Sequence, residues 1–204
     1  MSKIVVLSVA ILMASIPALA VETVPFLGFS LQMNNPTGDF ADNDLQPGDG
    51  IADPGGGVEL DVGLANAHVM AYVGLRANKF DVDSPDNWQG EWSANRLAVG
   101  VRANLGSNSR APVLPTIGGG ITVGRTKLEG GMPFELETKR KSDTSIGWFI
   151  EGGVNARLSD AADLLANLQY HAFEAEFDEG PYVEQFDISF VTLQVGVAVY
   201  LGNW

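Results

Sequence analysis

The sequence predicts an all-β fold, an eight-stranded antiparallel up-and-down transmembrane β-barrel. Beyond position 21, hydrophobic residues recur at every second position in many short segments, while no long segment shows the 3.6-residue period of an amphipathic helix. The residues between them are rich in glycine and charged groups, and long connections alternate with short ones. Together these observations indicate strands that separate an apolar environment from a narrow polar one.

Composition limits the classes of protein that the chain can represent. With 204 residues, 46% hydrophobic and 18% charged, the chain suits one folded domain and is too apolar for overall disorder. Acidic residues outnumber basic ones 25 to 12, and the longest basic run is Lys139-Arg140-Lys141, so nucleic acid is excluded as a partner. The absence of cysteine excludes a disulfide scaffold and a thiolate metal site.

Residues 1–20 have the features of a cleaved secretory signal peptide. Lys3 supplies the positive start, residues 4–16 form an apolar segment, and Ala18-Leu19-Ala20 offers the small residues that a signal peptidase accepts. The alternative, a transmembrane anchor, would need about 20 apolar residues, and Pro17 interrupts this shorter run. We therefore expect export, with residues 21–204 forming the mature barrel domain.

Eight segments carry the two-residue alternation of a strand. The clearest, residues 192–201, places aliphatic side chains on one face and small or polar ones on the other. Four more strands of the same kind are predicted at 58–64, 68–78, 96–105 and 146–158, and three weaker ones at 27–33, 116–123 and 164–171.

Glycine decides which face is inside. A soluble exported barrel, one alternative, would place Lys, Glu, Thr and Ser on its polar face. Here that face holds Gly28, Gly63, Gly74, Gly100, Gly118, Gly120, Gly147, Gly153 and Gly196. Small residues beside long charged ones suit the narrow lumen of an eight-stranded barrel, so the aliphatic face is predicted to meet lipid. Closure of the barrel would leave no unpaired strand edge in the membrane.

Charged residues on the polar face form a predicted lumenal charge network, and the following seven residues belong to it: Glu59, Asp61, Arg76, Arg96, Arg102, Glu151 and Arg157. We expect the arginines and carboxylates to pair, because an unpaired charge in such an interior is strongly disfavoured. The network is interpreted as a structural filling of the lumen. The alternative is a narrow water-filled pore for small solutes.

The connections predict the orientation of the barrel. Long polar loops are expected at 34–55, 81–92, 129–143 and 178–187, and short turns at 65–67, 106–112 and 159–163. Outer-membrane barrels place their long loops outside the cell. Two aromatic girdles are also expected, with Phe80, Trp92, Trp148, Phe173, Phe186 and Phe190 on the loop side and Phe26, Tyr200 and Trp204 on the turn side.

Three segments resemble the later hairpins of the eight-stranded outer-membrane β-barrel family, which includes the OmpA transmembrane domain and OmpX. They are VLPTIGGGITVGR at 113–125, GGVNARLSDAADLLANLQY at 152–170 and TLQVGVAVYL at 192–201. The resemblance implies the outer membrane of a Gram-negative bacterium, contact with its lipid and lipopolysaccharide, and insertion by the barrel assembly machinery. The family usually ends on an outward aromatic residue, whereas here Leu201 has that phase and Gly202-Asn203-Trp204 follows. We expect a monomer.

Little in the sequence points to catalysis. Residues 119–126 match the spacing of a phosphate-binding loop with Arg125 in place of lysine, but they lie within a predicted strand. A lipid-modifying barrel enzyme would need serine, histidine and a carboxylate together, and His171 has no suitably placed serine. We therefore predict no catalytic residue and no cofactor.

The first predicted loop is a weak candidate for calcium binding. It is rich in Asp and Gly, and its candidate ligands are Asp42, Asp44, Asp49 and Asp53. No bidentate glutamate completes the EF-hand pattern, so a solvated acidic loop is the preferred interpretation. The sequence predicts a structural or adhesion-type surface role through acidic extracellular loops, with the pore and the lipid-modifying enzyme as alternatives.

Overall fold

The computed structural model describes residues 23–41, 52–83, 89–106, 112–131, 138–179 and 182–202. The predicted signal peptide lies outside these ranges. The described elements are β1 (Val24–Thr37), the 3-10 turn η2 (Gly38–Ala41), β2 (Gly55–Ala65), β3 (Val69–Asp83), β4 (Gln89–Asn104), β5 (Val113–Gly131), β6 (Thr138–Lys141), β7 (Ser145–Ser159), β8 (Ala162–Glu179) and β9 (Tyr182–Tyr200). No helix in these ranges is long and apolar enough to cross a membrane.

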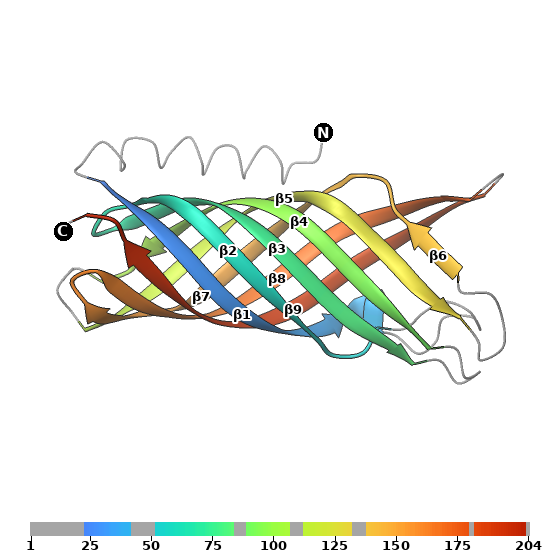
Figure 1. Cartoon of the computed structure of the whole chain (residues 1–204), viewed down its shortest axis with the longest axis horizontal. Coiled ribbons are helices and arrows are strands. Elements are labelled where there is room, and N and C mark those ends of the chain that lie inside the picture. The colour runs from blue at the N-terminus through green and yellow to red at the C-terminus, as the bar shows by residue number, and fades with distance from the viewer. Residues whose placement is uncertain are drawn as a thin grey trace.

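Eight long strands close into a barrel (Figure 1). Neighbours in the sequence pair antiparallel, β1 pairs with β9, and the pairing of β4 with β5 completes the ring. The short β6 pairs with residues 127–130 of β5, beyond residue 124, where the pairing of β5 with β7 stops. It therefore extends the barrel wall at one end. The predicted eight-stranded antiparallel up-and-down barrel is therefore confirmed. The end with the tight β2–β3 and β7–β8 connections is called the turn side, and the opposite end is called the loop side.

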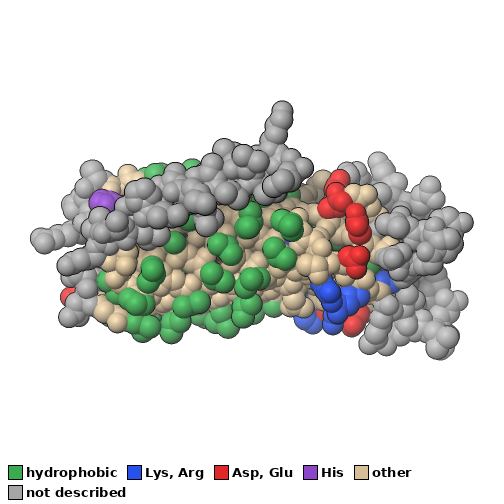
Figure 2. Space-filling view, turned by 90° about the horizontal axis from the view of Figure 1, so that it is seen from above, with side chains coloured by type: hydrophobic (Ala, Val, Ile, Leu, Met, Phe, Trp, Pro, Cys, Tyr) green, Lys and Arg blue, Asp and Glu red, His purple; other side chains and the backbone are tan. Residues whose placement is uncertain are grey.

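In the turn-side part of the barrel, alternate residues of each strand face outward and inward as the sequence predicts, with aliphatic side chains outside and polar ones in the lumen. In β1, Leu27, Leu31 and Met33 are exposed on the outer wall, while Ser30 and Gln32 are buried in the lumen. Figure 2 shows hydrophobic side chains spread over this part of one face, with acidic and basic side chains gathered beside them toward the loop side. We call the outward hydrophobic zone the apolar belt.

The alternation inverts beyond the belt. In β3, Val73 and Leu75 are exposed outward, but Phe80 and Val82, farther along the same strand, point inward and are each only 1% exposed. The outward position between them, Asp81, is exposed to solvent. A wall that stands in water needs a polar outside and an apolar inside, which is the reverse of a wall in lipid. We call this part of the barrel the loop-side extension.

The predicted bounds of the long loops are wrong because the strands continue into them. Residues 81–83 and 89–92 belong to β3 and β4, and residues 178–179 and 182–187 belong to β8 and β9. The predicted loop at 129–143 likewise contains the end of β5 and all of β6, and the one at 34–55 contains the end of β1 and η2. The outer face turns polar where the wall leaves the belt, so the hydrophobic alternation fades while the backbone pairing persists.

The predicted aromatic girdles are also wrong. Phe80, Trp92, Phe173 and Phe190 are buried inside the barrel, and Phe186 packs against the same cluster. On the turn side, Phe26 and Tyr200 are buried in the lumen, and Trp204 lies outside the described residues. Of the nine, Trp148 faces outward, with its ring centroid 5.5 Å from that of Tyr170. Aromatic rings are used here chiefly to fill the two ends of the lumen.

Candidate functional site

The lumen contains two buried ion pairs between charged residues that the sequence places there. Glu59 of β2 lies directly opposite Arg76 of β3 in the strand register, and Arg76 Nη2 is 2.9 Å from Glu59 Oε1. Glu59 is fully buried and its other oxygen accepts hydrogen bonds from Gln32 at 2.7 Å and Gln194 at 2.9 Å. These amides compensate much of the desolvation of a buried carboxylate.

The second pair has the bidentate geometry of a strong guanidinium–carboxylate interaction. Arg102 Nε donates to Glu151 Oε1 at 3.0 Å and Nη2 donates to Oε2 at 2.9 Å. Tyr72 and Gln169 also donate to this carboxylate, at 3.1 Å and 2.9 Å. Side chains from three other strands thus contact Glu151 of β7, which ties β3, β4, β7 and β8 together across the lumen.

Glycines make the room for this network, as their polar-face positions predict. A Cβ added to Gly74 would collide with the carboxylate of Asp61, which is itself buried. A Cβ on Gly118 would lie 2.6 Å from Glu151 Oε1, and one on Gly100 would lie 2.6 Å from the Tyr72 ring. Side chains at these positions would displace the charged groups that fill the lumen.

The two remaining lumenal arginines, Arg96 and Arg157, differ in whether a carboxylate lies near them. Arg96 has no described carboxylate within ion-pair distance; its guanidinium lies 3.8 Å from the Phe173 ring centroid and donates to Thr122 Oγ1 at 3.0 Å. Arg157 lies at the turn-side mouth, with Nε 4.0 Å from Asp163 Oδ1. The expectation that the lumenal arginines and carboxylates pair with one another is therefore wrong for Arg96, whose cation–π contact and hydroxyl partners replace a carboxylate. It is also wrong for the buried Asp61, which has no described base within ion-pair distance.

Uncharged polar residues also belong to the lumenal network, to which the sequence analysis assigned only charged side chains. Besides Gln32, Gln169 and Gln194, they include Asn34, Asn78, Asn167, Tyr72 and Thr192. Their signal was available, because each lies on the face of its strand opposite the alternating aliphatic residues. His171 also belongs to the lumen: its ring stacks on Phe190 at 4.7 Å and on Phe149 at 5.8 Å, and Nε2 lies 3.0 Å from Gln169 Oε1.

Aromatic packing closes the lumen at the loop side. Phe40 of η2 and Phe80 of β3 have ring centroids 5.2 Å apart, and Phe80 and Phe190 of β9 are 5.0 Å apart. Trp92 lies between Phe40 at 5.7 Å and Phe177 at 5.8 Å, and it is only 1% exposed. We call this group the aromatic cluster. Because η2 follows β1 directly, the first connection folds a phenylalanine into the barrel mouth.

The calcium candidates find no support in the described residues. Asp42, Asp44 and Asp49 lie outside the described ranges, and Asp53 is half-buried with its backbone amide donating to Asp81 O at 2.8 Å. Among the described residues, no group of three or more His, Cys, Asp or Glu side chains could hold a metal ion. The second histidine, His68, is exposed at the turn side.

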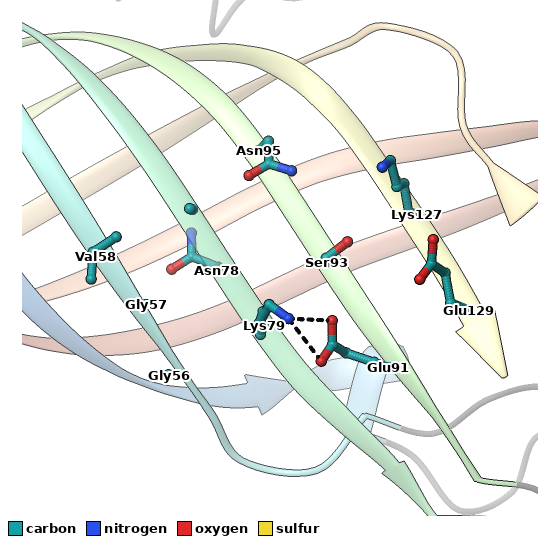
Figure 3. Close-up of a pocket in the computed structure, with 11 residues that line it drawn as sticks. Gly56, Gly57, Val58, Asn78, Lys79, Glu91, Ser93, Asn95, Lys127 and Glu129 are labelled. Atoms are coloured by element: carbon teal, nitrogen blue, oxygen red, sulfur yellow. Dashed lines mark hydrogen bonds and ion pairs between the residues drawn. The ribbon is translucent and has the colours of Figure 1, made fainter. Parts of the chain in front are cut away.

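On the outer wall of the loop-side extension, charged residues of both signs lie close together. Lys79 Nζ donates to both oxygens of Glu91, at 2.8 and 3.0 Å, and these bonds with the charge of Glu91 raise the pKa of Lys79. Figure 3 shows this pair on β3 and β4, with Lys127 and Glu129 beside it on β5. A hollow of about 580 Å³ lies among these side chains.

A closed barrel with an apolar belt and a polar lumen defines an integral outer-membrane β-barrel protein. The chain belongs to the outer membrane protein beta-barrel domain family, whose sequence profile matches residues 6–200. The protein is therefore located in the outer membrane of a Gram-negative bacterium.

Solved structures of outer-membrane proteins share this fold. Neisserial surface protein A (NspA) aligns over 87% of this chain and 98% of its own, with 13% sequence identity and a TM-score of 0.58. OprG from Pseudomonas aeruginosa aligns over 88% of this chain and 95% of its own, with 13% identity and a TM-score of 0.54. At such identities the likeness concerns the fold. No curated protein sequence matches the chain.

Proposed function

We propose that this protein is a closed, non-catalytic barrel that acts at the cell surface by presenting a rigid acidic wall to cationic partners. The observation that carries the proposal is the loop-side extension itself. Its strands stay paired well beyond the apolar belt, and the aromatic cluster gives it a core of its own. A wall held in this way can bind a partner without first being ordered, which lowers the entropic cost of association.

The acidic wall is formed by β8 and β9, neither of which contains lysine or arginine. Glu174 of β8 lies directly opposite Asp187 of β9, and both are exposed. The exposed Glu176 is on the same face, and the backbone amide of Asp143 donates to the Glu176 carbonyl at 2.9 Å. Like charges directly opposite one another destabilise a sheet. A cationic partner would relieve this repulsion and would be steered to the wall by its charge.

The alternatives are less well supported. The charged lumenal side chains bury one another: Glu59 is 0% and Arg102 1% exposed, which argues against a water-filled pore beside them. His171, the histidine with nearby carboxylates in the sequence, is buried between two phenylalanine rings. A catalytic histidine at the lipid interface would need access to substrate.

The proposal is tested by measuring poly-lysine binding to the barrel in phosphatidylcholine nanodiscs. The double variant Glu174→Gln/Asp187→Asn should bind poly-lysine more weakly, by up to about fivefold for each carboxylate removed, and added salt should weaken the wild type more than the variant. The matched control Asp81→Asn/Glu129→Gln removes two carboxylates from the opposite side of the extension, where Lys79 and Lys127 lie. Unchanged binding in the first variant, or an equal loss in the control, would refute the proposal.

A further inference from the structure

The outer wall over β2, β3 and β4 carries three adjoining hollows that together cross from the apolar belt to the loop-side extension. Their volumes, in order from the belt, are about 640, 340 and 580 Å³. The first and second share Leu60, Leu75 and Leu97, and the second and third share Val58, Ala77 and Asn95. Because adjoining hollows share lining residues, they lie in series along the outer wall, and we call this series the outer-wall groove.

The groove changes character along its length. At the belt its lining includes Leu60 and Leu75, which are 54% and 61% exposed to the outside. At the loop side its lining includes Lys79, Ser93 and Lys127, which Figure 3 shows on the three neighbouring strands β3, β4 and β5. A molecule that fills the whole groove must therefore be apolar at one end and polar at the other.

Basic residues form a row across the head of the groove. The strand register places Lys79 beside Ser93, Ser93 beside Lys127, and Lys127 beside Lys141 of β6. The outward row four residues nearer the belt is aliphatic and consists of Leu75, Leu97, Val123 and Ile146. At about 3.4 Å per residue, the bases lie within roughly 14 Å of the last aliphatic row, and Arg125 lies between the two rows. This is the depth at which lipid headgroups meet a barrel wall.

The charges in this row differ in their partners. Lys79 is paired with Glu91, whereas no carboxylate of the described residues lies within ion-pair distance of Arg125, Lys127 or Lys141. Arg125 is exposed and donates to Thr144 Oγ1 at 2.9 Å. The acidic residues Glu91 and Glu129 lie in the next row away from the belt. On β3, β4 and β5, an anionic group arriving from the membrane therefore meets the bases before the acids.

We propose that the outer-wall groove binds a lipid of the surrounding leaflet whose phosphate groups give it a net negative charge. One acyl chain lies along Leu60, Leu75 and Leu97, and the phosphate contacts Lys127, Lys141 and Arg125. Charge complementarity and the continuity of the groove with the apolar belt select this occupant. A soluble anion would leave the apolar part of the groove empty, and an uncharged lipid would leave the bases without a counterion.

Native mass spectrometry of the folded barrel, titrated in detergent with diphosphoryl lipid A, tests the proposal. The double variant Lys127→Gln/Lys141→Gln should lose about fivefold in lipid affinity for each base removed, since a base near a membrane surface contributes about 1 kcal/mol to binding anionic lipid. Its control, Arg157→Gln, removes a base at the turn-side mouth and should retain the affinity of the wild type. Phosphatidylcholine, which has no net charge, should bind the double variant and the wild type equally.

A second pair of variants tests the apolar part of the groove. Ala77→Trp should fill the groove between its second and third hollows and reduce lipid A binding at least fivefold, while Ala166→Trp, on the outer face of β8 across the barrel, should not. Heat-modifiable gel mobility verifies that each variant is folded. Equal binding by all variants, equal losses in the controls, or full displacement of lipid A by millimolar inorganic phosphate would overturn the proposal.

Discussion

At the scale of single residues, the surroundings of a side chain depend on its position along the strand as much as on whether it faces inward or outward. Arg76 and Phe80 lie four residues apart on β3 and share the inward phase. Arg76 joins the charge network with Glu59, whereas Phe80 joins the aromatic cluster with Phe40 and Phe190. The lumen inside the belt is polar because the barrel buries its apolar side chains in lipid there, and it becomes apolar where the outer wall meets water.

The first prediction concerns the bidentate pair. Arg102→Met leaves the carboxylate of Glu151 buried without its cation, so it should lower the free energy of unfolding by about 3–5 kcal/mol. Urea unfolding of the refolded barrel, followed by tryptophan fluorescence, measures this change. Lys79→Met is the control: it breaks an exposed pair, with side chains 68% and 40% exposed, and should change stability little. Similar losses in both variants would contradict the assignment of a buried network.

At the scale of elements, the strands are longer than a membrane crossing requires. A tilted strand crosses with about 9–11 residues, whereas β5 and β9 each have 19 residues and β8 has 18. The surplus forms the loop-side extension, and the aromatic cluster supplies the core that keeps it paired. Strand ends standing in water without such a core would fray, because an isolated hairpin is only marginally stable.

Trp92→Ala should therefore loosen the extension and leave the belt intact. Truncating a buried tryptophan costs about 3–5 kcal/mol, and Trp92 contacts Phe40, Phe177 and Phe186. Hydrogen exchange should become faster in residues 80–83 and 89–94 but not in 69–76. In the control Trp148→Ala, which removes an outward ring of the wall, exchange in the extension should stay at the wild-type rate. Uniform acceleration along β3 would show that the extension has no core of its own.

At the scale of the whole molecule, buried side chains obstruct the lumen at successive levels along the barrel axis. The aromatic cluster fills the loop-side end, and the two buried ion pairs with their amide partners fill the middle. The four lumenal arginines are balanced by Glu59, Asp61, Glu151 and Asp163, so the formal charge of −13 is carried by residues outside this set. Among the described acidic residues outside this set, Glu174, Glu176 and Asp187 are exposed on the outer wall of the loop-side extension.

Recordings in planar phosphatidylcholine bilayers should show no unitary current steps. The same silence is expected for Phe190→Ala, because opening the aromatic cluster leaves the charge network beneath it unchanged. Insertion is verified by the heat-modifiable gel mobility of the recovered protein. Stable, anion-selective steps from the wild type would support the narrow-pore alternative and refute the closed lumen.

Much of the fold could be predicted from the alternation alone. Leu31, Leu75 and Leu97 lie on the lipid side, and all seven predicted network residues lie on the inward face. The ends of the strands could not be predicted in the same way. The predicted ends were set by the last outward-facing hydrophobic residue of each strand, and these residues stop at the edge of the belt. Continuing the inward phase from Arg76 through Phe80 to Val82 would have shown that the strand does not end there.

The sequence by itself determined the closed antiparallel barrel and which face meets lipid, because the two-residue period is a local property that every strand carries independently. Only the tertiary structure decided which charges pair, that Arg96 rests on Phe173 rather than on a carboxylate, and that the aromatic residues fill the lumen instead of forming girdles. Those outcomes depend on which strands face one another across the lumen. That arrangement follows from the closure of the barrel and its stagger, which no single strand specifies.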